Sequence, residues 1–400
     1  MNAAAAERPN MKRSSTAEQT PRVARIAAGD ATLGTLLEHL IRVSLSGLPR
    51  MFRPDGRTFV HSRRLDADGG MRLAGTSIRY GAIVLLGVHG LPEAQQRLIL
   101  GGEDAKAFCA RLIHDSQGST NLGDVALVTW AAAELAHDLL PRARDRLFQL
   151  SERDGELFTV EWAWLVSALS ATKRDDTTSG LLARAVDRLL GSFSPEAGVF
   201  SHRLRGGKRG WRSHVACFAD QVYPIQALAR HHAASGHSEG LAAANRCAEL
   251  ICRVQGSAGQ WWWHYDARNG RVIEGYPVYS VHQDAMGPMA LLDLAEAGGN
   301  DHADAIRLGL RWMETAWEVG RSLIDDERAV IWRKVGRTDP AKLVRVARAA
   351  ASRLHPNLTL DPLDAAFPAR KIDFECRPYH LGWVLHSWLN GLGRCIEHGA

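Results

Sequence analysis

The sequence predicts an all-α chain in which a ring of six inner helices is enclosed by a ring of six outer helices. From Thr35 onward, apolar residues recur at helical spacing, and no stretch sustains the alternation typical of a strand. Two kinds of helix alternate along the chain. A related turn also recurs between an outer helix and the next inner one, which indicates a repeat architecture. Six helical hairpins closed into a double ring account for all three observations.

The outer helices are amphipathic, with charged residues along one face and apolar residues along the other. A helix with this pattern has one side in water and one side against the protein. The sequence predicts outer helices over residues 35–48, 93–115, 142–151, 179–193, 239–255 and 302–317.

The inner helices are apolar nearly all round, and their few polar residues gather in the first turns. A helix without a polar face is enclosed by other helices. The sequence predicts inner helices over residues 77–91, 121–139, 158–169, 214–232, 278–297 and 375–392. In a double ring, the polar first turns of these helices meet at one mouth.

The recurring turn joins a helix end to an acidic or glycine-bearing turn and then to an aromatic residue. Its copies are MFRPDGRTF at 51–59, LSERDGELF at 150–158, FSPEAGVF at 193–200, VQGSAGQW at 254–261 and LIDDERAVIW at 323–332. The copies are degenerate, so coincidental helix-capping chemistry is the alternative explanation.

Composition places the chain among large globular proteins, because 400 residues with 46% hydrophobic side chains can bury an extensive core. The net charge of +5 comes from arginines scattered over helix surfaces, so we expect no nucleic-acid partner. This mild basicity suits an acidic small molecule or an anionic sugar polymer. The longest apolar run, GAIVLLGV from Gly81, is too short to cross a bilayer.

The cysteines and the N-terminal residues indicate the cellular compartment of the protein. Six cysteines without a CxxC pair predict reduced thiols and a cytoplasmic location. Residues 1–30 lack the apolar segment of a secretory signal, so we expect a disordered tail before a single domain over 31–400.

Residues 337–372 are predicted to form a basic amphipathic helix and a proline-rich connection. We expect this insertion to be a flap over one mouth of the barrel; a solvated arm is the alternative.

One turn carries a family resemblance. Gln255, Gly259 and Trp261 fit the Q-x3-G-x-W half of the repeat motif of squalene and hopene cyclases. The whole pattern, from Thr35 to Gly393, resembles the wider group of α/α toroids, which includes terpenoid cyclases, prenyltransferase β subunits, six-hairpin glycosidases, sugar epimerases and polysaccharide lyases. The resemblance implies an (α/α)6 toroid and does not transfer a function.

The predicted mouth collects polar and aromatic residues, and buried charges of this kind either form a structural network or line a wet cavity. Aromatic planes beside carboxylates, tyrosines and arginines suit a carbohydrate, since sugar faces stack on rings. The candidate catalytic residues are Asp284, His282, Asp220, Glu161, Tyr279, Tyr379 and His380. The candidate substrate-binding residues are Arg79, Tyr80, Asp124, His214, Trp262, Trp263, Tyr276, Glu375 and Arg377.

Two neighbouring pairs suggest proton transfer. His282 with Asp284, and His214 with Asp220, place an imidazole near a carboxylate at the start of an inner helix. A capping aspartate with a hydrogen-bonded histidine is the structural alternative for each. The roles we assign are Asp284 or Asp220 with His282 as acid and base, Glu161 and Glu375 as second carboxylates, Tyr279 or Tyr379 as proton relay, and Arg79 and Arg377 as carboxylate clamps.

The three consecutive tryptophans fall in a turn or short hairpin bracketed by Gly256, Gly259 and Gly270. Adjacent side chains cannot all point one way. We therefore expect Trp261 to plug the space between hairpins and Trp262 or Trp263 to face a ligand.

The sequence thus predicts a carbohydrate-active enzyme, a hydrolase, lyase or uronate epimerase acting on a polysaccharide or a sugar-bearing intermediate of polysaccharide synthesis. No cofactor and no metal is expected, although Cys217 near His214 and Cys376 near His380 leave a zinc site open. Two alternatives remain: a terpenoid cyclase or prenyltransferase-like enzyme acting on a polyprenyl substrate, and a non-catalytic helical scaffold. Asp175 in KRDDTT resembles the aspartate with which terpenoid cyclases protonate their substrate. It begins an outer helix, however, where we interpret it as an N-cap. The oligomeric state stays open.

Overall fold

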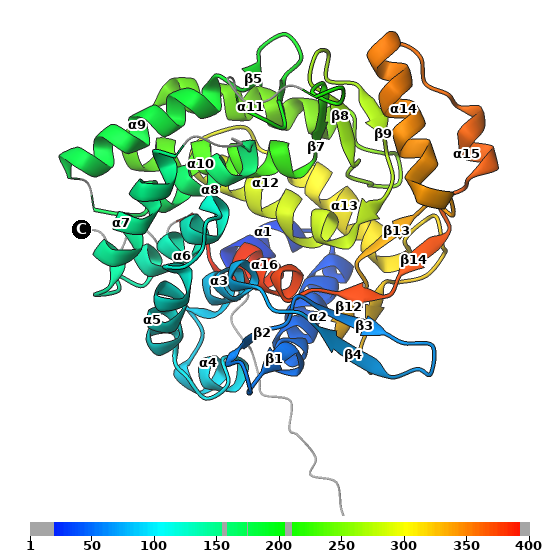
Figure 1. Ribbon diagram of the computed structural model, residues 1–400. Coiled ribbons are helices and arrows are strands. Elements are labelled where there is room, and N and C mark those ends of the chain that lie inside the picture. Colours follow the sequence, from blue (N-terminus) through cyan, green and yellow to red (C-terminus); the bar gives the residue numbers. More distant parts are fainter. Residues whose placement is uncertain (1–19, 154–157, 174, 205–209, 393–400) are drawn as a thin grey trace, which may run out of the picture.

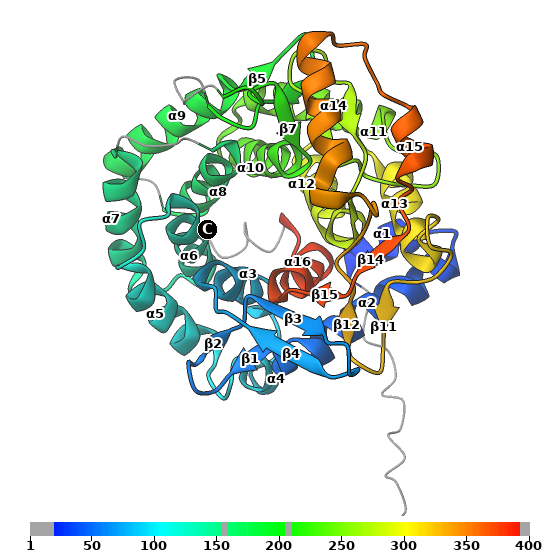
Figure 2. The same ribbon diagram turned by 45° about the vertical axis from the view of Figure 1, so that its right-hand side comes forward.

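The computed structural model describes residues 20–153, 158–173, 175–204 and 210–392, which form an (α/α)6 toroid (Figure 1). Each inner helix packs against the next, and the last packs against the first, so the inner ring closes (Figure 2). The inner helices are α3 (Ile78–Val88), α6 (Leu122–Glu134), α8 (Thr159–Ser170), α10 (Ala219–Ser235), α12 (Gly287–Glu296) and α16 (Pro378–Leu389). The predicted fold class is confirmed.

The outer helices lie around this ring, each with its apolar face against it. They are α2 (Ala31–Gly47), α4 (Glu93–Ile99), α5 (Ala105–Ser116), α7 (Leu140–Ser151), α9 (Asp176–Leu190), α11 (Ser238–Arg253) and α13 (Ala303–Thr315). The single helix predicted over 93–115 is wrong. It is divided at residues 100–104, where Gly101 adopts a positive φ of 68° and packs so tightly that a Cβ would lie 2.1 Å from the Phe52 ring.

The recurring turns repeat in three dimensions as well as in sequence. Three of them are β-hairpins in which residues seven positions apart are paired: Phe52 with Phe59, Phe193 with Phe200, and Ile324 with Ile331. In each hairpin the residue five positions after the first has a positive φ, and Gly259 repeats this in the turn at 254–261. The strands are β1 (Phe52–Arg53), β2 (Thr58–Phe59), β5 (Phe193–Ser194), β6 (Val199–Phe200), β11 (Ile324–Asp325) and β12 (Val330–Ile331). The copy at 150–158 lies partly outside the described residues.

Three small antiparallel sheets lie at the end of the ring where the inner helices begin, because four of their strands immediately precede inner helices. The sheets are β15–β3–β4, from Glu375–Cys376, Ser62–Leu65 and Met71–Ala74; β7–β8–β9, from Val215–Cys217, His264–Asp266 and Val272–Glu274; and β10–β13–β14, from Val278–Tyr279, Lys334–Gly336 and Lys371–Asp373. Strands of two to four residues are too short to display alternation in sequence.

These sheets explain why three inner helices start later than predicted. Residues 215–217, 278–279 and 375–376 pair in strands instead of continuing the helices. A π-helical turn, η2 (His282–Met286), then leads into α12. The candidate site therefore lies on strands, turns and helix starts together.

Residues 20–30, which the sequence assigned to a disordered tail, are ordered, whereas residues 1–19 lie outside the described residues. Helix α1 (Pro21–Ala27) packs against α2, α13 and α16, and Arg22 is almost fully buried between Asp293 and Glu296. A buried guanidinium paired with two carboxylates holds this segment on the toroid. The boundary predicted at residue 30 is therefore wrong.

The remaining elements connect the hairpins. Helix α14 (Leu343–Leu354) is the basic amphipathic helix predicted within 337–372, and its Ala349 packs on Val215 and Ile273 near the mouth. The others are η1 (Pro49–Met51), η3 (Pro340–Lys342) and α15 (Pro362–Ala366). No helix within the described ranges is long and apolar enough to cross a bilayer.

Candidate active site

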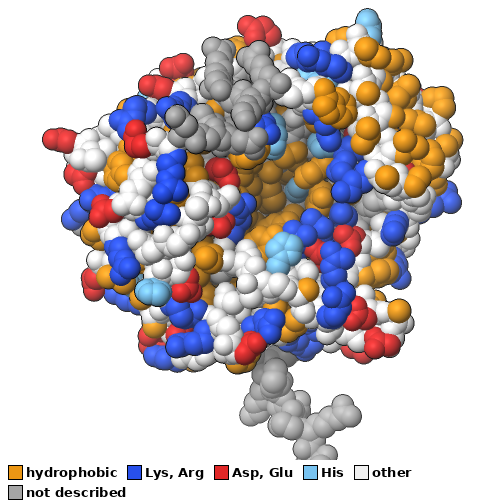
Figure 3. All heavy atoms as spheres, in the orientation of Figure 1, with side chains coloured by type: hydrophobic (Ala, Val, Ile, Leu, Met, Phe, Trp, Pro, Cys, Tyr) orange, Lys and Arg blue, Asp and Glu red, His pale blue; other side chains and the backbone are white. Residues whose placement is uncertain are grey.

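The surface is hollowed where the inner helices begin, with hydrophobic side chains in the depth and basic side chains along part of the edge (Figure 3). Aromatic rings from four inner helices build this mouth. The Tyr80 and Tyr379 rings lie 4.8 Å apart, and the Trp164 and Tyr223 rings lie 5.0 Å apart. Burial raises the pKa of the Tyr223 and Tyr379 hydroxyls, so both remain protonated hydrogen-bond donors.

The first turns of α3, α6 and α8 meet in a hydrogen-bonded charged cluster. Arg79 donates from Nε to Asp124 Oδ1 at 2.8 Å and from Nη2 to Asn121 Oδ1 at 2.7 Å. Asn121 in turn donates to Glu161 Oε1 at 3.0 Å, and the Arg79 guanidinium lies 5.0 Å above the Trp164 ring. The structure therefore brings the predicted Arg79, Asp124 and Glu161 together, and all three keep partial exposure.

Glu375 lies in β15, just before α16, the inner helix that neighbours α3. Its carboxylate is fully buried and pairs with Arg64, Arg377 and, at 3.5 Å, Arg333. Arg377 also donates to the Tyr80 hydroxyl at 2.9 Å. Glu375 is therefore engaged by three guanidinium groups, and its contacts position Arg377 instead of offering a free carboxylate to a ligand.

Asp284 pairs with His380, and the predicted pairing of His282 with Asp284 is wrong. His380 Nε2 lies 2.9 Å from both Asp284 carboxylate oxygens, and both side chains are buried. Burial raises the pKa of the Asp284 carboxyl, opposed by its contact with His380. Residues two positions apart face different sides of a helix, so His282 and Asp284 diverge.

His282 is a buried neutral imidazole within an aromatic cluster. Its ring centre lies 4.5 Å from that of Phe218, 4.9 Å from Tyr279 and 5.8 Å from Trp263, on which it stacks. Burial, assisted by His380 and Arg333, lowers the pKa of His282 to about 3. At neutral pH it therefore carries no charge.

Asp220 and His214 also have partners other than each other. His214 Nε2 lies 2.9 Å from the Ser352 hydroxyl of α14. Asp220 is fully buried, accepts from the Cys217 backbone N–H at 2.7 Å and lies 3.0 Å from His202 Nδ1. The hydrogen bond with Asp220 raises the pKa of His202.

Sequence reasoning missed three mouth residues that the repeat places at the same position as the predicted Trp263. Each follows the second paired residue of its hairpin by two: His61 after Phe59, His202 after Phe200 and Arg333 after Ile331, as Trp263 follows Trp261. His61 stacks on Tyr80 at 5.2 Å, and the Arg333 guanidinium lies 5.3 Å from the Tyr279 ring. Continuing the repeat register beyond each turn would have found these residues.

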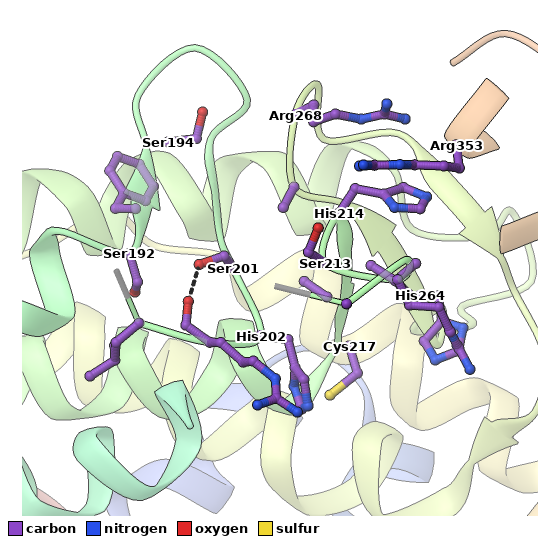
Figure 4. A pocket seen from close by; sticks show the side chains of 18 of the residues that line it. Ser192, Ser194, Ser201, His202, Ser213, His214, Cys217, His264, Arg268 and Arg353 are labelled. Atoms are coloured by element: carbon purple, nitrogen blue, oxygen red, sulfur yellow. Dashed lines mark hydrogen bonds between the residues drawn. The ribbon is translucent and has the colours of Figure 1, made fainter. Parts of the chain in front are cut away.

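A cavity of about 910 Å³ opens beside the mouth, between the β5–β6 hairpin, the β7–β8 strands and α14 (Figure 4). His202 and Cys217 lie together at its base, whereas Arg268 and Arg353 lie at its upper edge. Trp263 and His264 connect this cavity to the aromatic cluster around Tyr279.

Two partly buried arginines of this cavity have no counterion within the part of the chain that the structure describes. Arg212 and Arg345 have no acidic partner among the residues that the structure describes, and the Arg345 Nε is buried without a hydrogen bond there. Burial, followed by the charge of Arg345, lowers the pKa of Arg212. Both arginines, after burial, also hold the pKa of His264 well below its usual value. The cavity is therefore electropositive.

The three tryptophans divide between core and cavity. Trp261 is fully buried against Phe218, Gly287 and Gly309, and Trp263 lines the cavity. Trp262 instead packs edge-on against Tyr276, at 5.8 Å between ring centres. Tyr276 donates to Glu318 at 3.0 Å, so the predicted ligand contacts Trp262 and Tyr276 lie away from the cavity wall.

Asp175, which the sequence compared with the acid of terpenoid cyclases, has a structural role. Asp175 caps α9 on the outer ring, accepting from Thr178 N at 2.7 Å and pairing with Arg144. The cyclase-like acid therefore lies away from the mouth.

Within the described chain, one group of three potential metal ligands occurs: His202, Cys217 and Asp220, whose ligand atoms all lie within 4.8 Å of one another. This set differs from the pairs that the sequence suggested.

Comparison with known proteins identifies the fold alone. No protein family model matches the sequence, and no curated protein sequence matches it. An unsaturated glucuronyl hydrolase specific for heparin has a similar structure, with a TM-score of 0.57 at 13% identity over 91% of this chain and 97% of that chain. A possible member of the GH105 family from Klebsiella pneumoniae gives 0.52 at 12% identity over 92% and 94%. A glycosidase gives 0.53 at 13% identity over 90% and 98%.

Proposed function

We propose that this chain is an enzyme that acts on an anionic, uronate-bearing saccharide at the mouth of the toroid. The observation that carries the proposal is the pair Arg212 and Arg345, which face the cavity without an acidic partner in the described chain. Cations that are partly removed from water are costly unless an anion accompanies them. A carboxylate on the ligand would supply that anion.

The aromatic residues support a sugar as the carrier of this charge. Trp263 and Tyr279 lie 4.8 Å apart between ring centres, and Trp263 lines the cavity beside His264. Aromatic faces of this kind stack against the apolar face of a pyranose ring. The similarity to an unsaturated glucuronyl hydrolase also supports a uronate as the ligand.

Hydrolysis, elimination and epimerisation all require proton transfer at a positioned side chain. Asp124 and Glu161 are candidates because both carboxylates keep partial exposure at the mouth and are held by Arg79 or Asn121. Tyr279 and Tyr379 would serve as neutral donors, since burial raises the pKa of each. Asp284 with His380 lies deeper and would position the η2 turn beneath them.

A binding experiment tests the substrate class. A disaccharide that carries glucuronate is compared with the same disaccharide carrying glucose, by calorimetry at fixed salt. Loss of one charge-assisted contact corresponds to about 1.5–3 kcal/mol, or roughly 10–100-fold in affinity. We expect Arg345→Ala to lose this preference for the uronide, whereas the control Arg184→Ala, on the outer face of α9, retains it. Equal affinity of the wild-type protein for both sugars would contradict the proposal.

Turnover of the bound uronide tests whether the protein is an enzyme. Glu161→Gln and Asp124→Asn preserve the size of each side chain and remove its proton chemistry. We expect one of them to reduce product formation by about 100-fold or more while binding persists. Product formation that is unchanged in both variants would remove these carboxylates from the mechanism.

A further inference from the structure

We propose that His202, Asp220 and Cys217 form a binding site for a divalent metal ion, with zinc favoured by the ligand types. Imidazole, carboxylate and thiolate are the groups that zinc binds in proteins, at about 2.0–2.3 Å. The proposal concerns a metal site at the base of the cavity and does not depend on the identity of the saccharide.

The ligand atoms of the three side chains lie close enough together to converge on one metal ion. Asp220 Oδ2 lies 3.0 Å from His202 Nδ1, and the ligand atoms of all three residues lie within 4.8 Å of one another. Ligands around a tetrahedral zinc are separated by roughly 3.2–3.8 Å, given bond lengths of 2.0–2.3 Å. Small side-chain rotations would therefore bring the three atoms into a single coordination sphere.

Each ligand is placed by a different element of the fold. His202 follows β6, Cys217 ends β7, and Asp220 lies in the first turn of α10. The backbone N–H of Cys217 donates to Asp220 at 2.7 Å, which fixes the carboxylate relative to the strand. The pairing of Cys217 with His264 across β7 and β8 holds the strand itself. A site assembled from rigid elements is already close to its bound geometry.

Charge balance favours a dication at this position. A Zn²⁺ ion bound by one thiolate and one carboxylate forms a neutral centre. Neutrality matters because Arg203 and Arg212 lie close enough to His202 to act on it electrostatically. A dication at this position would compensate the fully buried Asp220 carboxylate and lower the cost of forming the Cys217 thiolate beside it.

The arrangement leaves an open coordination position that faces the cavity. His202 and Cys217 both line the cavity, whereas Asp220 approaches from the buried side. Three protein ligands with a fourth position open to a ligand are typical of reactive zinc sites, whereas structural sites have four protein ligands. The open position would take a water molecule or a hydroxyl oxygen of a bound sugar.

A nucleophilic thiol explains the same residues less well. A cysteine nucleophile needs an imidazole next to its sulfur, with the carboxylate on the far side of that imidazole. Here the Asp220 carboxylate contacts the Cys217 side chain and backbone as well as His202, so it lies beside the thiol and not only beyond the imidazole. The other cysteines within the described ranges lack such neighbours; Cys252, for example, has its pKa raised by burial alone.

Metal loading of the full-length protein tests the site. The tag-free chain is stripped with a chelator, reloaded with Zn²⁺ or Co²⁺, desalted and analysed by plasma mass spectrometry. We expect about one ion per chain for the wild type, a reduction of at least fivefold for Cys217→Ser and His202→Gln, and no reduction for Cys252→Ser. With Co²⁺, the wild type should show a sulfur-to-metal charge-transfer band that Cys217→Ser lacks.

Defined outcomes would overturn the proposal. Absence of bound ion in the reloaded wild type would do so, and so would equal ion content in wild type, Cys217→Ser and His202→Gln, which indicates adventitious surface binding. Circular dichroism of each variant checks folding, and His202→Gln is included because His202 is partly exposed and tolerates replacement better than a core residue. No saccharide enters this measurement, so its result is separate from that of the uronide experiment.

Discussion

At the scale of single residues, two buried imidazoles of the inner ring stay neutral at physiological pH. His282 has its pKa lowered to about 3 by burial, and His386, at the far end of α16, to about 4. In the unfolded chain both groups bind a proton near pH 6.5. The unfolded state therefore binds more protons than the folded state between these values, and the free energy of unfolding decreases as pH falls below about 6.5.

Replacement of His282 isolates its share of this pH dependence. Between pH 7 and pH 5, one histidine that titrates only when unfolded corresponds to about 2 kcal/mol. We expect the wild-type protein to lose stability over this range and His282→Phe, which keeps an aromatic ring, to lose about 2 kcal/mol less. Urea unfolding at pH 7 and pH 5 measures both. Parallel pH profiles for the two proteins would show that His282 does not titrate as its burial implies.

At the scale of elements, helix α1 is attached to the toroid by one buried network. Arg22 donates to Glu296 at 2.6 Å, to the Ser387 carbonyl oxygen at 3.0 Å and to Asp293. Asp293 also accepts from Gln226 at 3.1 Å, so the network links α1 with α10, α12 and α16. Val23 and Ile26 of the same helix are buried in the core, and a helix of only seven residues depends on such contacts for its position.

The attachment of α1 can be measured by removing its guanidinium. We expect Arg22→Ala to reduce the free energy of unfolding by about 3–5 kcal/mol, because Asp293 loses a partner inside the core. The matched control is Arg25→Ala on the same helix, whose exposed pair with Asp301 contributes at most about 1 kcal/mol. Similar losses for the two variants in urea unfolding would indicate that the buried network does not hold the helix.

At the scale of the whole molecule, the toroid is closed by the contact between its first and last inner helices. A Cβ at Gly87 of α3 would lie 2.4 Å from the Gly382 carbonyl oxygen of α16, and one at Gly382 would lie 2.9 Å from the Val84 Cα. The two backbones therefore approach at distances that only glycine allows at these two positions. Both helices carry mouth residues, so this seam also fixes Tyr80 against Tyr379.

Because the ring is closed at this contact, we expect Gly87→Ala to destabilise the protein and Gly180→Ala to leave its stability unchanged or increased. Gly87→Ala adds a methyl group against a backbone oxygen, and we expect a loss of about 2–3 kcal/mol or more in unfolding free energy. Gly180→Ala, on the exposed face of α9 with only an arginine side chain 3.9 Å away, should be neutral or stabilise by up to about 1 kcal/mol. Thermal unfolding of the pair distinguishes the two; equal effects would contradict a tightly closed seam.

Across these scales, some site residues could be predicted from sequence and others could not. Arg79, Asp124 and Glu161 were predictable because polar residues in the first turns of enclosed helices must reach the mouth. His202 and Arg333 were not found, since they lie just beyond short strands that leave no periodic signal. The strands that occupy the first residues of three predicted inner helices were not predicted, for the same reason.

The sequence by itself determined the order of the helices, their division into enclosed and partly solvated kinds, and hence the double ring, because helical periodicity and the number of apolar faces are local properties. Only the tertiary structure decided which side chains are partners. Asp284 contacts His380, which lies 96 positions later, and Asp220 contacts His202, 18 positions earlier. These pairings arise from closure of the ring and from the hairpins at its mouth, and no local pattern encodes which distant elements that closure brings together.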